Sequence, residues 1–214
     1  MTEHQAQTWL EENFDVSREA WMQLESFIEF LRNEALSQNL VSASTLGSIW
    51  SRHIVDSVQL LKFLPHKLPD SKKWIDLGSG AGFPGIVIAI LTDYPMTLVE
   101  SRGRRIAYLK RAIAMLGLEE RVSLAGMPLE RLETTVYSVI SARAFAPLPR
   151  LFDLAARFST DKTIWLLPKG RNAAKEWEGV QSSLIGNFRI ETSVTDANSG
   201  ILVGQLSSMR QHPR

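Results

Sequence analysis

The residues with the clearest chemical potential lie in one short stretch, residues 73–85, KWIDLGSGAGFPG. An apolar pair, Trp74-Ile75, is followed by an acid and then by four closely spaced glycines: Asp76, Gly78, Gly80, Gly82 and Gly85. Glycine permits positive φ and leaves space for a ligand because it has no Cβ. Pro84 is placed to open a helix over the apolar residues 86–91, and a helix start offers free backbone N–H groups. The order strand, glycine turn, helix therefore predicts a site for a nucleotide-like ligand.

Two cofactor classes fit this loop. A literal GxGxxG match, with Glu100 about twenty residues further on, is what a dinucleotide-binding fold requires. The longer pattern D-x-G-x-G-x-G is typical of S-adenosylmethionine (AdoMet) methyltransferases, and a dinucleotide-binding loop has no need of its acid. The sequence thus favours AdoMet over NAD, and a glycine turn without a ligand is the third alternative. The cofactor-binding residues predicted from the loop are Asp76, Gly78, Gly80 and Gly82.

Composition excludes several classes of protein. The chain has 214 residues, of which 44% are hydrophobic, enough for one substantial core. It contains no cysteine, which excludes disulfides and cysteine nucleophiles, and its four histidines lack ligand spacing. No apolar run reaches the length of a membrane span, and the N-terminus is too acidic for a signal peptide. We therefore expect a cytoplasmic protein without metal or membrane contact. With a net charge of only +1, any RNA contact must come from local patches.

Alternating strand and helix patterns follow from Trp74 onwards and predict a doubly wound, mainly parallel sheet. A short polar turn at residues 196–200 joins the last two strands, so they form a C-terminal β-hairpin and one of them is antiparallel to the sheet. A dinucleotide-dependent dehydrogenase would normally carry a second catalytic domain, for which there is no room. We therefore expect a Rossmann-like class I AdoMet-dependent methyltransferase fold with a seven-stranded sheet. The expected strands are 74–76, 96–100, 122–125, 138–141, 163–167, 188–194 and 201–206, with helices at about 102–116, 147–158 and 172–184.

Two helical patterns precede the first strand. One begins after Ser17 as N-cap and runs to about Leu36, and the second covers about residues 46–61. Residues 1–70 are thus predicted to form a helical extension packed on a core of residues 71–214. The second helix carries a polar cluster that includes Arg52, His53 and Asp56. A solvated face with an Arg52–Asp56 pair is the alternative to a functional role.

Glu100, at the end of the second predicted strand, has a specific use in this fold. Its carboxylate can accept two charge-assisted hydrogen bonds from neighbouring ribose hydroxyls. The alternative is an exposed acid that opens the next helix, where a negative charge is favourable. Residues 126–131 follow the third predicted strand and are expected beside the adenine.

Several motifs resemble one family in the same order. The segments NLVSAST, SRHIVDS, DLGSGAGFPGIVIAI, LVESRGRRIAYLKR, VISARAFAPL and LLPKG lie between about Asn39 and Gly170, and they resemble the RsmG (GidB) family of bacterial methyltransferases. This resemblance implies methyl transfer from AdoMet to N7 of a guanine in a decoding-region loop of 16S ribosomal RNA. It also implies AdoMet contacts at Gly78, Phe83, Leu129, Glu130 and Arg143. The family usually reads ISRA where this chain has ISARA, with one extra alanine before Arg143.

The chain's own chemistry agrees with an N7 target. Guanine N7 has a lone pair and no proton, so its methylation requires no general base. The [DN]PP[YF] motif common in exocyclic-amine methylation is absent, as is the cysteine that C5 methylation needs. Catalysis would then consist of alignment and electrostatics, with Arg143, Lys169 and His53 as substrate-positioning residues near the cleft mouth. A small-molecule methyltransferase and a binding protein with a degenerate loop remain as alternatives.

Overall fold

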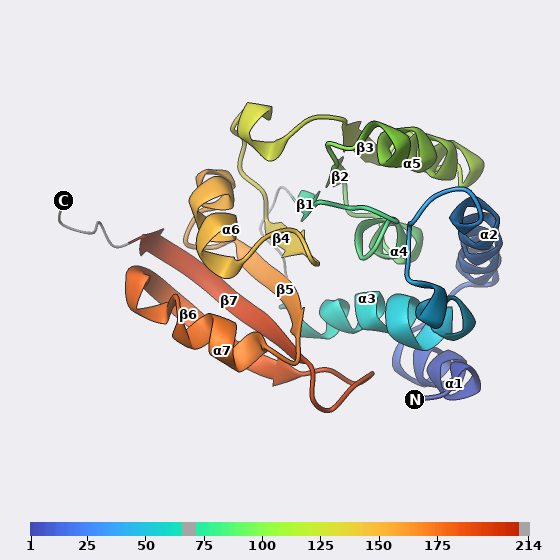
Figure 1. The fold of residues 1–214 in the computed structure, drawn as a ribbon, viewed down its shortest axis with the longest axis horizontal. Coiled ribbons are helices and arrows are strands. Elements are labelled where there is room, and N and C mark those ends of the chain that lie inside the picture. Colours follow the sequence, from blue (N-terminus) through green and yellow to red (C-terminus); the bar gives the residue numbers. More distant parts are fainter. Residues whose placement is uncertain (66–71, 210–214) are drawn as a thin grey trace.

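The computed structural model describes residues 1–65 and 72–209. Its centre is a seven-stranded sheet with the order β3-β2-β1-β4-β5-β7-β6 (Figure 1). Strands β1 to β5 run parallel to one another, and β7 is antiparallel to both β5 and β6. The predicted parallel sheet with its C-terminal hairpin is confirmed. The strands are β1 Trp74–Leu77, β2 Met96–Val99, β3 Val122–Ala125, β4 Val139–Ala142, β5 Ile164–Gly170, β6 Leu184–Thr192 and β7 Gly200–Met209.

The order of the strands reverses between β1 and β4, which places a crevice at their carboxyl ends. Leu77, the last residue of β1, lies opposite Val99 of β2 on one side and Ala142 of β4 on the other. The residues that follow these strands, Gly78, Glu100 and Arg143, are therefore brought to one edge of the sheet. This is the edge where the sequence predicted the site.

Helices cover both faces of the sheet, as Figure 1 shows. One face carries α1, α2, α4 and α5, and its core contains Phe27, Ile86 and Leu109. The other face carries α6 and α7, with Phe152 and Trp165 in its core. Burial on both faces explains why the parallel strands are continuously apolar instead of alternating. The helices are α1 Glu3–Asn13, α2 Arg18–Ala35, α3 Asp56–Val58, α4 Gly85–Leu91, α5 Gly103–Met115, α6 Leu148–Ala155 and α7 Ala173–Glu178.

The N-terminal region contains one helix that the sequence patterns did not predict. Helix α1 starts with a capping box formed by Thr2 and Gln5, but only Ala6 and Leu10 of it are buried, too few to give a helical period. The Ser17 N-cap of α2 is confirmed, since its Oγ accepts from the N–H of Ala20 at 3.1 Å. The predicted domain boundary at residue 70 lies outside the described residues, and the division into two parts stays a prediction.

The second predicted helix is not a regular α-helix. It consists of the 3₁₀ segment η1 Ala43–Ser48, the π-helix η2 Trp50–Val55, the short α3, and the 3₁₀ segment η3 Gln59–Phe63. The reason is tertiary. The Glu3 carboxylate accepts from the N–H groups of Trp50 and Ser51, both at 3.0 Å, so a distant side chain holds the start of the π-helix. π-Helical turns are frequently found at functional sites, which draws attention to this segment.

One prediction in the C-terminal part was also wrong. The helix expected over residues 172–184 ends at Glu178, is followed by the 3₁₀ turn η6 Gln181–Ser183, and β6 begins at Leu184. Leu184 is buried in the second core and pairs with Met209 of β7, so tertiary burial replaces the helix by a strand. Two further 3₁₀ turns are η4 Leu129–Arg131, which lies between β3 and β4, and η5 Ala156–Phe158, which lies between α6 and β5.

Candidate active site

The glycine loop is folded tightly over the end of β2. The N–H groups of Gly78 and Ser79 both donate to the carbonyl of Val99, at 2.8 and 3.0 Å. Gly78, Gly80 and Gly82 have φ values of 69°, 56° and 94°. These angles lie in the left-handed region that glycine occupies without steric cost. The alternating glycines are therefore required by the path of the backbone.

The glycines have different neighbours. A Cβ at Gly78 would lie 2.7 Å from Cδ2 of Phe145, on the side of the loop that faces a pocket. A Cβ at Gly82 would lie 2.9 Å from Ile86, within the core. At Gly85 it would collide with Leu98. The absence of a side chain at Gly78 thus permits the close approach of Phe145 beside the pocket. At Gly82 and Gly85 it allows helix α4 to pack on the sheet.

Asp76 lies beneath the loop and does not reach the pocket. Its side chain is fully buried, and its Oδ1 accepts from Ser141 Oγ at 2.7 Å. Ser141 Oγ in turn accepts from Trp74 Nε1 at 2.8 Å, so the three side chains join β1 to β4. Burial raises the pKa of Asp76 to about 6, against the opposing effect of its hydrogen bonds. Any effect of Asp76 on a cofactor must pass through the loop above it, not through direct contact.

Glu100 links the end of β2 to the glycine loop. Its Oε1 accepts from the N–H groups of Ser101 and Arg102, at 2.8 and 2.9 Å, and its Oε2 accepts from the N–H of Gly80 at 3.1 Å. Arg105 Nη1 lies 3.8 Å from Oε2. The carboxylate is 5% exposed and still lines the pocket. The alternative of an exposed helix-opening acid is therefore wrong.

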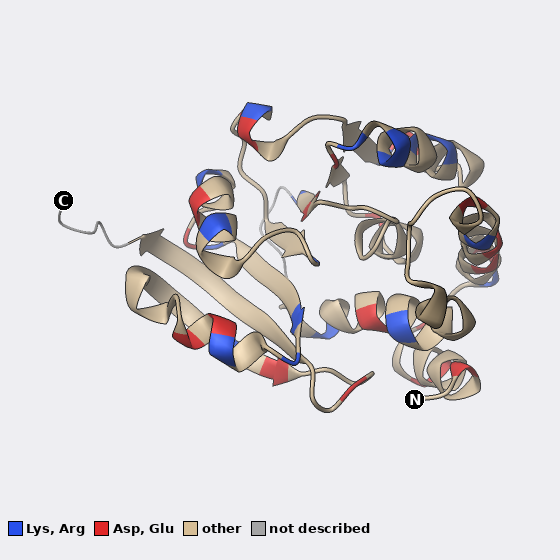
Figure 2. Ribbon diagram, in the orientation of Figure 1, with Lys and Arg blue, Asp and Glu red and all other residues tan. Residues whose placement is uncertain are grey.

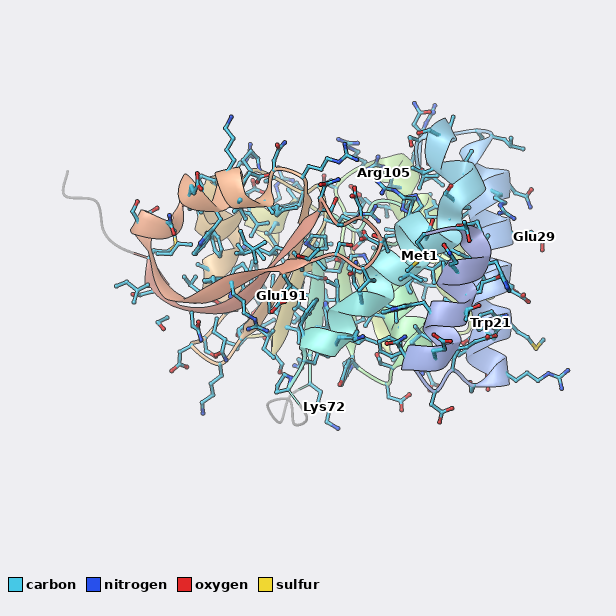
Figure 3. The ribbon with its side chains drawn as sticks, turned by 90° about the horizontal axis from the view of Figure 1, so that it is seen from below. Met1, Trp21, Glu29, Lys72, Arg105 and Glu191 are labelled. Atoms are coloured by element: carbon cyan, nitrogen blue, oxygen red, sulfur yellow. The ribbon has the colours of Figure 1, made fainter. Side chains whose placement is uncertain are left out.

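A pocket of about 390 Å³ lies at the carboxyl ends of the central strands. Gly78 and Glu100 line this pocket together with Leu129 and Glu130 of η4. Leu129 is fixed in place because its carbonyl accepts from Arg157 Nη2 at 2.6 Å. The structure therefore gathers four of the predicted cofactor residues around one cavity. In Figure 3, Arg105 lies near this edge of the sheet and Lys72, which precedes β1, lies at the opposite edge.

A second pocket of about 740 Å³ adjoins the first. The segment 144–147 lines both cavities and forms the wall between them. The larger pocket is also lined by Arg52, Asp56, Arg143, Lys169, Glu176, Ser193 and Thr195. Two pockets that share one thin wall suit the transfer of a group from a donor to an acceptor.

Comparison with known families and structures agrees with this arrangement. The family described as "GidB: rRNA small subunit methyltransferase G" matches residues 20–201. The chain belongs to this family. It is 52% identical over 206 residues to the "Ribosomal RNA small subunit methyltransferase G" of Sphingopyxis alaskensis, covering 94% of this chain and 85% of that relative. The protein of the same name from Rhizorhabdus wittichii is 51% identical, covering 95% of this chain and 92% of that relative.

Solved structures with similar folds are also methyltransferases. A putative O-methyltransferase from Klebsiella pneumoniae superposes with a TM-score of 0.61 at 15% identity, covering 94% of this chain and 96% of that one. An O-methyltransferase from Bacillus cereus, in complex with SAH, also has a TM-score of 0.61, at 10% identity, covering 92% of this chain and 96% of that one. At these identities the likeness shows the fold alone, which is the class I methyltransferase fold predicted from the sequence.

In this GidB-family chain, Arg143 is held on the side of the larger pocket. Its Nη1 lies 3.1 Å from His53 Nδ1, its Nη2 donates to the carbonyl of Arg52 at 3.1 Å, and its Nε lies 3.5 Å from Asp56 Oδ2. All three nitrogens of the guanidinium thus have partners on the π-helix or directly after it. Arg143 lines the larger pocket and not the smaller one, and the AdoMet contact implied by the resemblance stays a prediction.

His53 is held as a neutral ring. An arginine has no hydrogen-bond acceptor, so His53 Nδ1 must accept from Arg143, and Nε2–H is left to donate to Thr45 Oγ1 at 3.1 Å. Burial, together with the nearby charges of Arg143 and Arg52, lowers the pKa of His53 to about 3. The ring also stacks on Phe83, with centroids 4.7 Å apart. His53 therefore positions Arg143 and has no free lone pair to act as a base.

Two more predicted residues occupy supporting positions. Lys169 is only 8% exposed, and its Nζ donates to the carbonyl of Ala146 at 3.1 Å and pairs with Glu176 at 3.1 Å. It therefore supports the wall between the pockets, and its role in positioning the substrate stays a prediction. Phe83 is buried against His53 and Phe27 and lines neither pocket.

Within residues 1–65 and 72–209, no helix is long and apolar enough to cross a membrane. The same residues contain no group of three His, Cys, Asp or Glu side chains that could hold a metal ion.

Sequence reasoning missed the roles of Ser141 under the loop and of Arg157 behind Leu129. Both act through tertiary hydrogen bonds, at separations of 65 and 28 residues, that no local pattern signals.

Proposed function

We propose that this protein transfers the methyl group of AdoMet to N7 of a guanine in a decoding-region loop of 16S ribosomal RNA. The observation that supports this most directly is the pair of adjoining pockets at the carboxyl edge of the sheet. Family membership supports an rRNA substrate of the small subunit. A ribosomal RNA substrate also fits the cytoplasmic location expected from the sequence.

The residues of the smaller pocket fit AdoMet. Its volume lies within the usual range for small-ligand sites, about 300–1,000 Å³. Glu100 Oε2 accepts one N–H and retains capacity for a ribose hydroxyl. Leu129 and Glu130 would flank the adenine, and Gly78 leaves room for the backbone to approach the cofactor. Bound AdoMet supplies an electrophilic methyl group, and the protein supplies its position.

The larger pocket would receive the guanine. Its N7 lone pair attacks the methyl carbon while the carbon–sulfur bond breaks, so the base gains a positive charge and no proton moves. Arg143 is too strongly bonded to swing freely, and it defines the shape of the pocket beside Asp56. The carboxylates of Asp56 and Glu176 are part of the lining and balance the cations near the base. Alignment is thus the main contribution of the chain.

The small-molecule alternative fits less well. Methylation of a hydroxyl requires removal of a proton, for which a positioned base or a metal is the usual means. His53, which contacts the pocket-lining Arg143, is buried and its Nδ1 already accepts from that arginine. Of the carboxylates that line the pocket, Asp56 is paired with Arg143 and Glu176 with Lys169. The geometry therefore favours an acceptor atom that carries no proton.

The test uses small subunits from cells that lack a methyltransferase of this family. Purified protein and methyl-labelled AdoMet are added, and the modified guanines are mapped by mass. N7-methylguanine is distinguished from exocyclic methylation because its imidazolium ring opens in alkali. One alkali-labile methylguanine in 16S rRNA is expected, and no transfer with Gly80→Val. Label at an alkali-stable position, or on small hydroxylated compounds but not on RNA, would overturn the proposal.

A further inference from the structure

The loop between β6 and β7 places one carboxylate between two arginines at the mouth of the larger pocket. Asp196 Oδ2 lies 3.9 Å from Arg52 Nη1 and 3.5 Å from Arg171 Nε. Arg52 lines the pocket. Arg171 directly follows Gly170, and Gly170 also lines the pocket. In Figure 2, basic segments at the end of β5 and just before α3 lie on either side of the acidic tip of this loop. Two segments far apart in the chain thus direct their cations at a single oxygen.

Asp196 owes its position to its own loop, not to the arginines. Its Oδ1 accepts from the N–H of Asn198 at 3.0 Å, and its Oδ2 accepts from Ser199 Oγ at 3.1 Å. Hydrogen bonds also join the loop to η3 through Gln59. Its Nε2 donates to Ser193 Oγ at 3.1 Å, and its Oε1 accepts from the N–H of Val194 at 2.9 Å. The carboxylate is therefore a fixed part of the pocket mouth.

The two arginines, in contrast, are free to change partner. Their side chains are 48% and 74% exposed for Arg52 and Arg171, and both ion pairs are long. Exposed pairs of this kind contribute little to stability, so another anion can replace Asp196 at small cost. Arginine binds phosphate oxygens through paired hydrogen bonds, which makes phosphate a stronger partner than a distant carboxylate.

We infer that Arg52 and Arg171 together bind one backbone phosphate of the RNA substrate, and that Asp196 competes for the same two side chains in the free protein. This inference rests on the proposed function, because it takes the larger pocket as the place of the target guanine. A phosphate at the pocket mouth would fix the nucleotide next to the target guanine. Asp196 would disfavour loosely bound polyanions, since each must displace it, and so would contribute to selectivity.

The test compares charge-matched variants. Asp196→Asn keeps the Oδ1 acceptor of the turn and removes one negative charge. Its control, Glu34→Gln, removes one charge from another arginine pair, Arg111–Glu34, which lines neither pocket. Binding of a 16S rRNA fragment is measured by fluorescence anisotropy over a range of salt concentrations. Asp196→Asn should lower the Kd about three- to fivefold, and Glu34→Gln should leave it nearly unchanged.

Removal of the two cations gives the opposite result. The double variant Arg52→Ala/Arg171→Ala should raise the Kd about tenfold and lower the slope of log K against log salt by about one, because one phosphate contact is lost. Arg111→Ala is its control. Titration with AdoMet should give wild-type affinity in every variant, since none of these side chains lines the smaller pocket.

Two outcomes overturn the inference. One is an Asp196→Asn variant that binds RNA no more tightly than Glu34→Gln. The other is a double arginine variant whose salt slope equals that of Arg111→Ala. If wild-type protein methylates 16S rRNA while either result is found, only the phosphate site fails. If wild-type protein does not methylate 16S rRNA at all, the proposed function itself fails.

Discussion

Replacement of Glu100 by alanine should destabilise the glycine loop and so lower the free energy of unfolding of the protein. Three backbone N–H groups, those of Gly80, Ser101 and Arg102, donate to this carboxylate. A hydrogen bond to a charged group contributes about 1.5–3 kcal/mol, and a buried donor left without a partner is costly. Water entering from the pocket can satisfy some of these donors, and bonds to one carboxylate are not additive. We therefore expect a loss of about 3–5 kcal/mol of unfolding free energy.

The assay is urea unfolding of wild type, Glu100→Ala and Glu100→Gln, followed by calorimetric titration with AdoMet under folding conditions. Glutamine keeps one acceptor oxygen and should fall between the other two. Glu130→Ala is the matched control, because Glu130 is also a pocket-lining acid but is 48% exposed, and its carboxylate pairs with the exposed Arg150. It should change unfolding by less than about 1 kcal/mol. AdoMet affinity should fall about 10- to 150-fold in Glu100→Ala, through the loop and the lost ribose acceptor.

One result would refute this reasoning. If Glu100→Ala unfolds at the wild-type urea concentration and loses only AdoMet affinity, the carboxylate does not hold the loop. Glu100 would then act solely as a ligand for the ribose. Equal AdoMet affinity in Glu100→Ala and wild type would remove it from the cofactor site altogether.

Further predictions concern the loop and the Arg143 cluster. Gly80→Val should abolish AdoMet binding by calorimetry, because a branched side chain is strained at a φ of 56°, and wild-type affinity would contradict this. The single-turnover methylation rate should be flat from about pH 6 to 9, and a log-linear rise that His53→Asn removes would contradict an N7 target. Arg143→Ala should slow methylation without changing that pH profile. His53 stays neutral in the folded state down to about pH 3 but takes up a proton in the unfolded state below 6.5, so its contribution to stability is present above pH 6.5 and is lost as the pH falls. As the pH falls through that range, urea unfolding should show the free energy of unfolding of wild type falling by up to about 1.4 kcal/mol per pH unit relative to His53→Asn. Asp76, with its pKa raised to about 6, changes the free energy of unfolding in the opposite direction, and it does so equally in both proteins.

The parts of the site that follow from local sequence were predictable. The glycines are demanded by backbone angles of the loop itself, and Glu100 follows a strand whose end is marked by its apolar residues. The π-helix could not be foreseen, because the groups that hold it come from 47 residues before Trp50 and from 91 residues after Arg52. The same holds for the partner of Arg143. An i,i+4 rule suggests that Asp56 pairs with Arg52, but in the folded chain Asp56 faces Arg143, and Arg52 turns to Asp196.

The position of Arg143 also explains how one short segment can serve two pockets. Ala142, the extra alanine in the ISARA motif, occupies the last position of β4, opposite Leu77, and Arg143 leaves the sheet toward the π-helix. Ala144 then adopts a φ of 52°, which reverses the chain and brings Phe145 against Gly78. Lys169 holds the next carbonyl, that of Ala146. The cation on one side of the wall and the glycine loop on the other are thus fixed by consecutive residues. Because the same segment lines both pockets, it fixes their positions relative to each other, and a fixed orientation of two bound reactants is what the transfer requires.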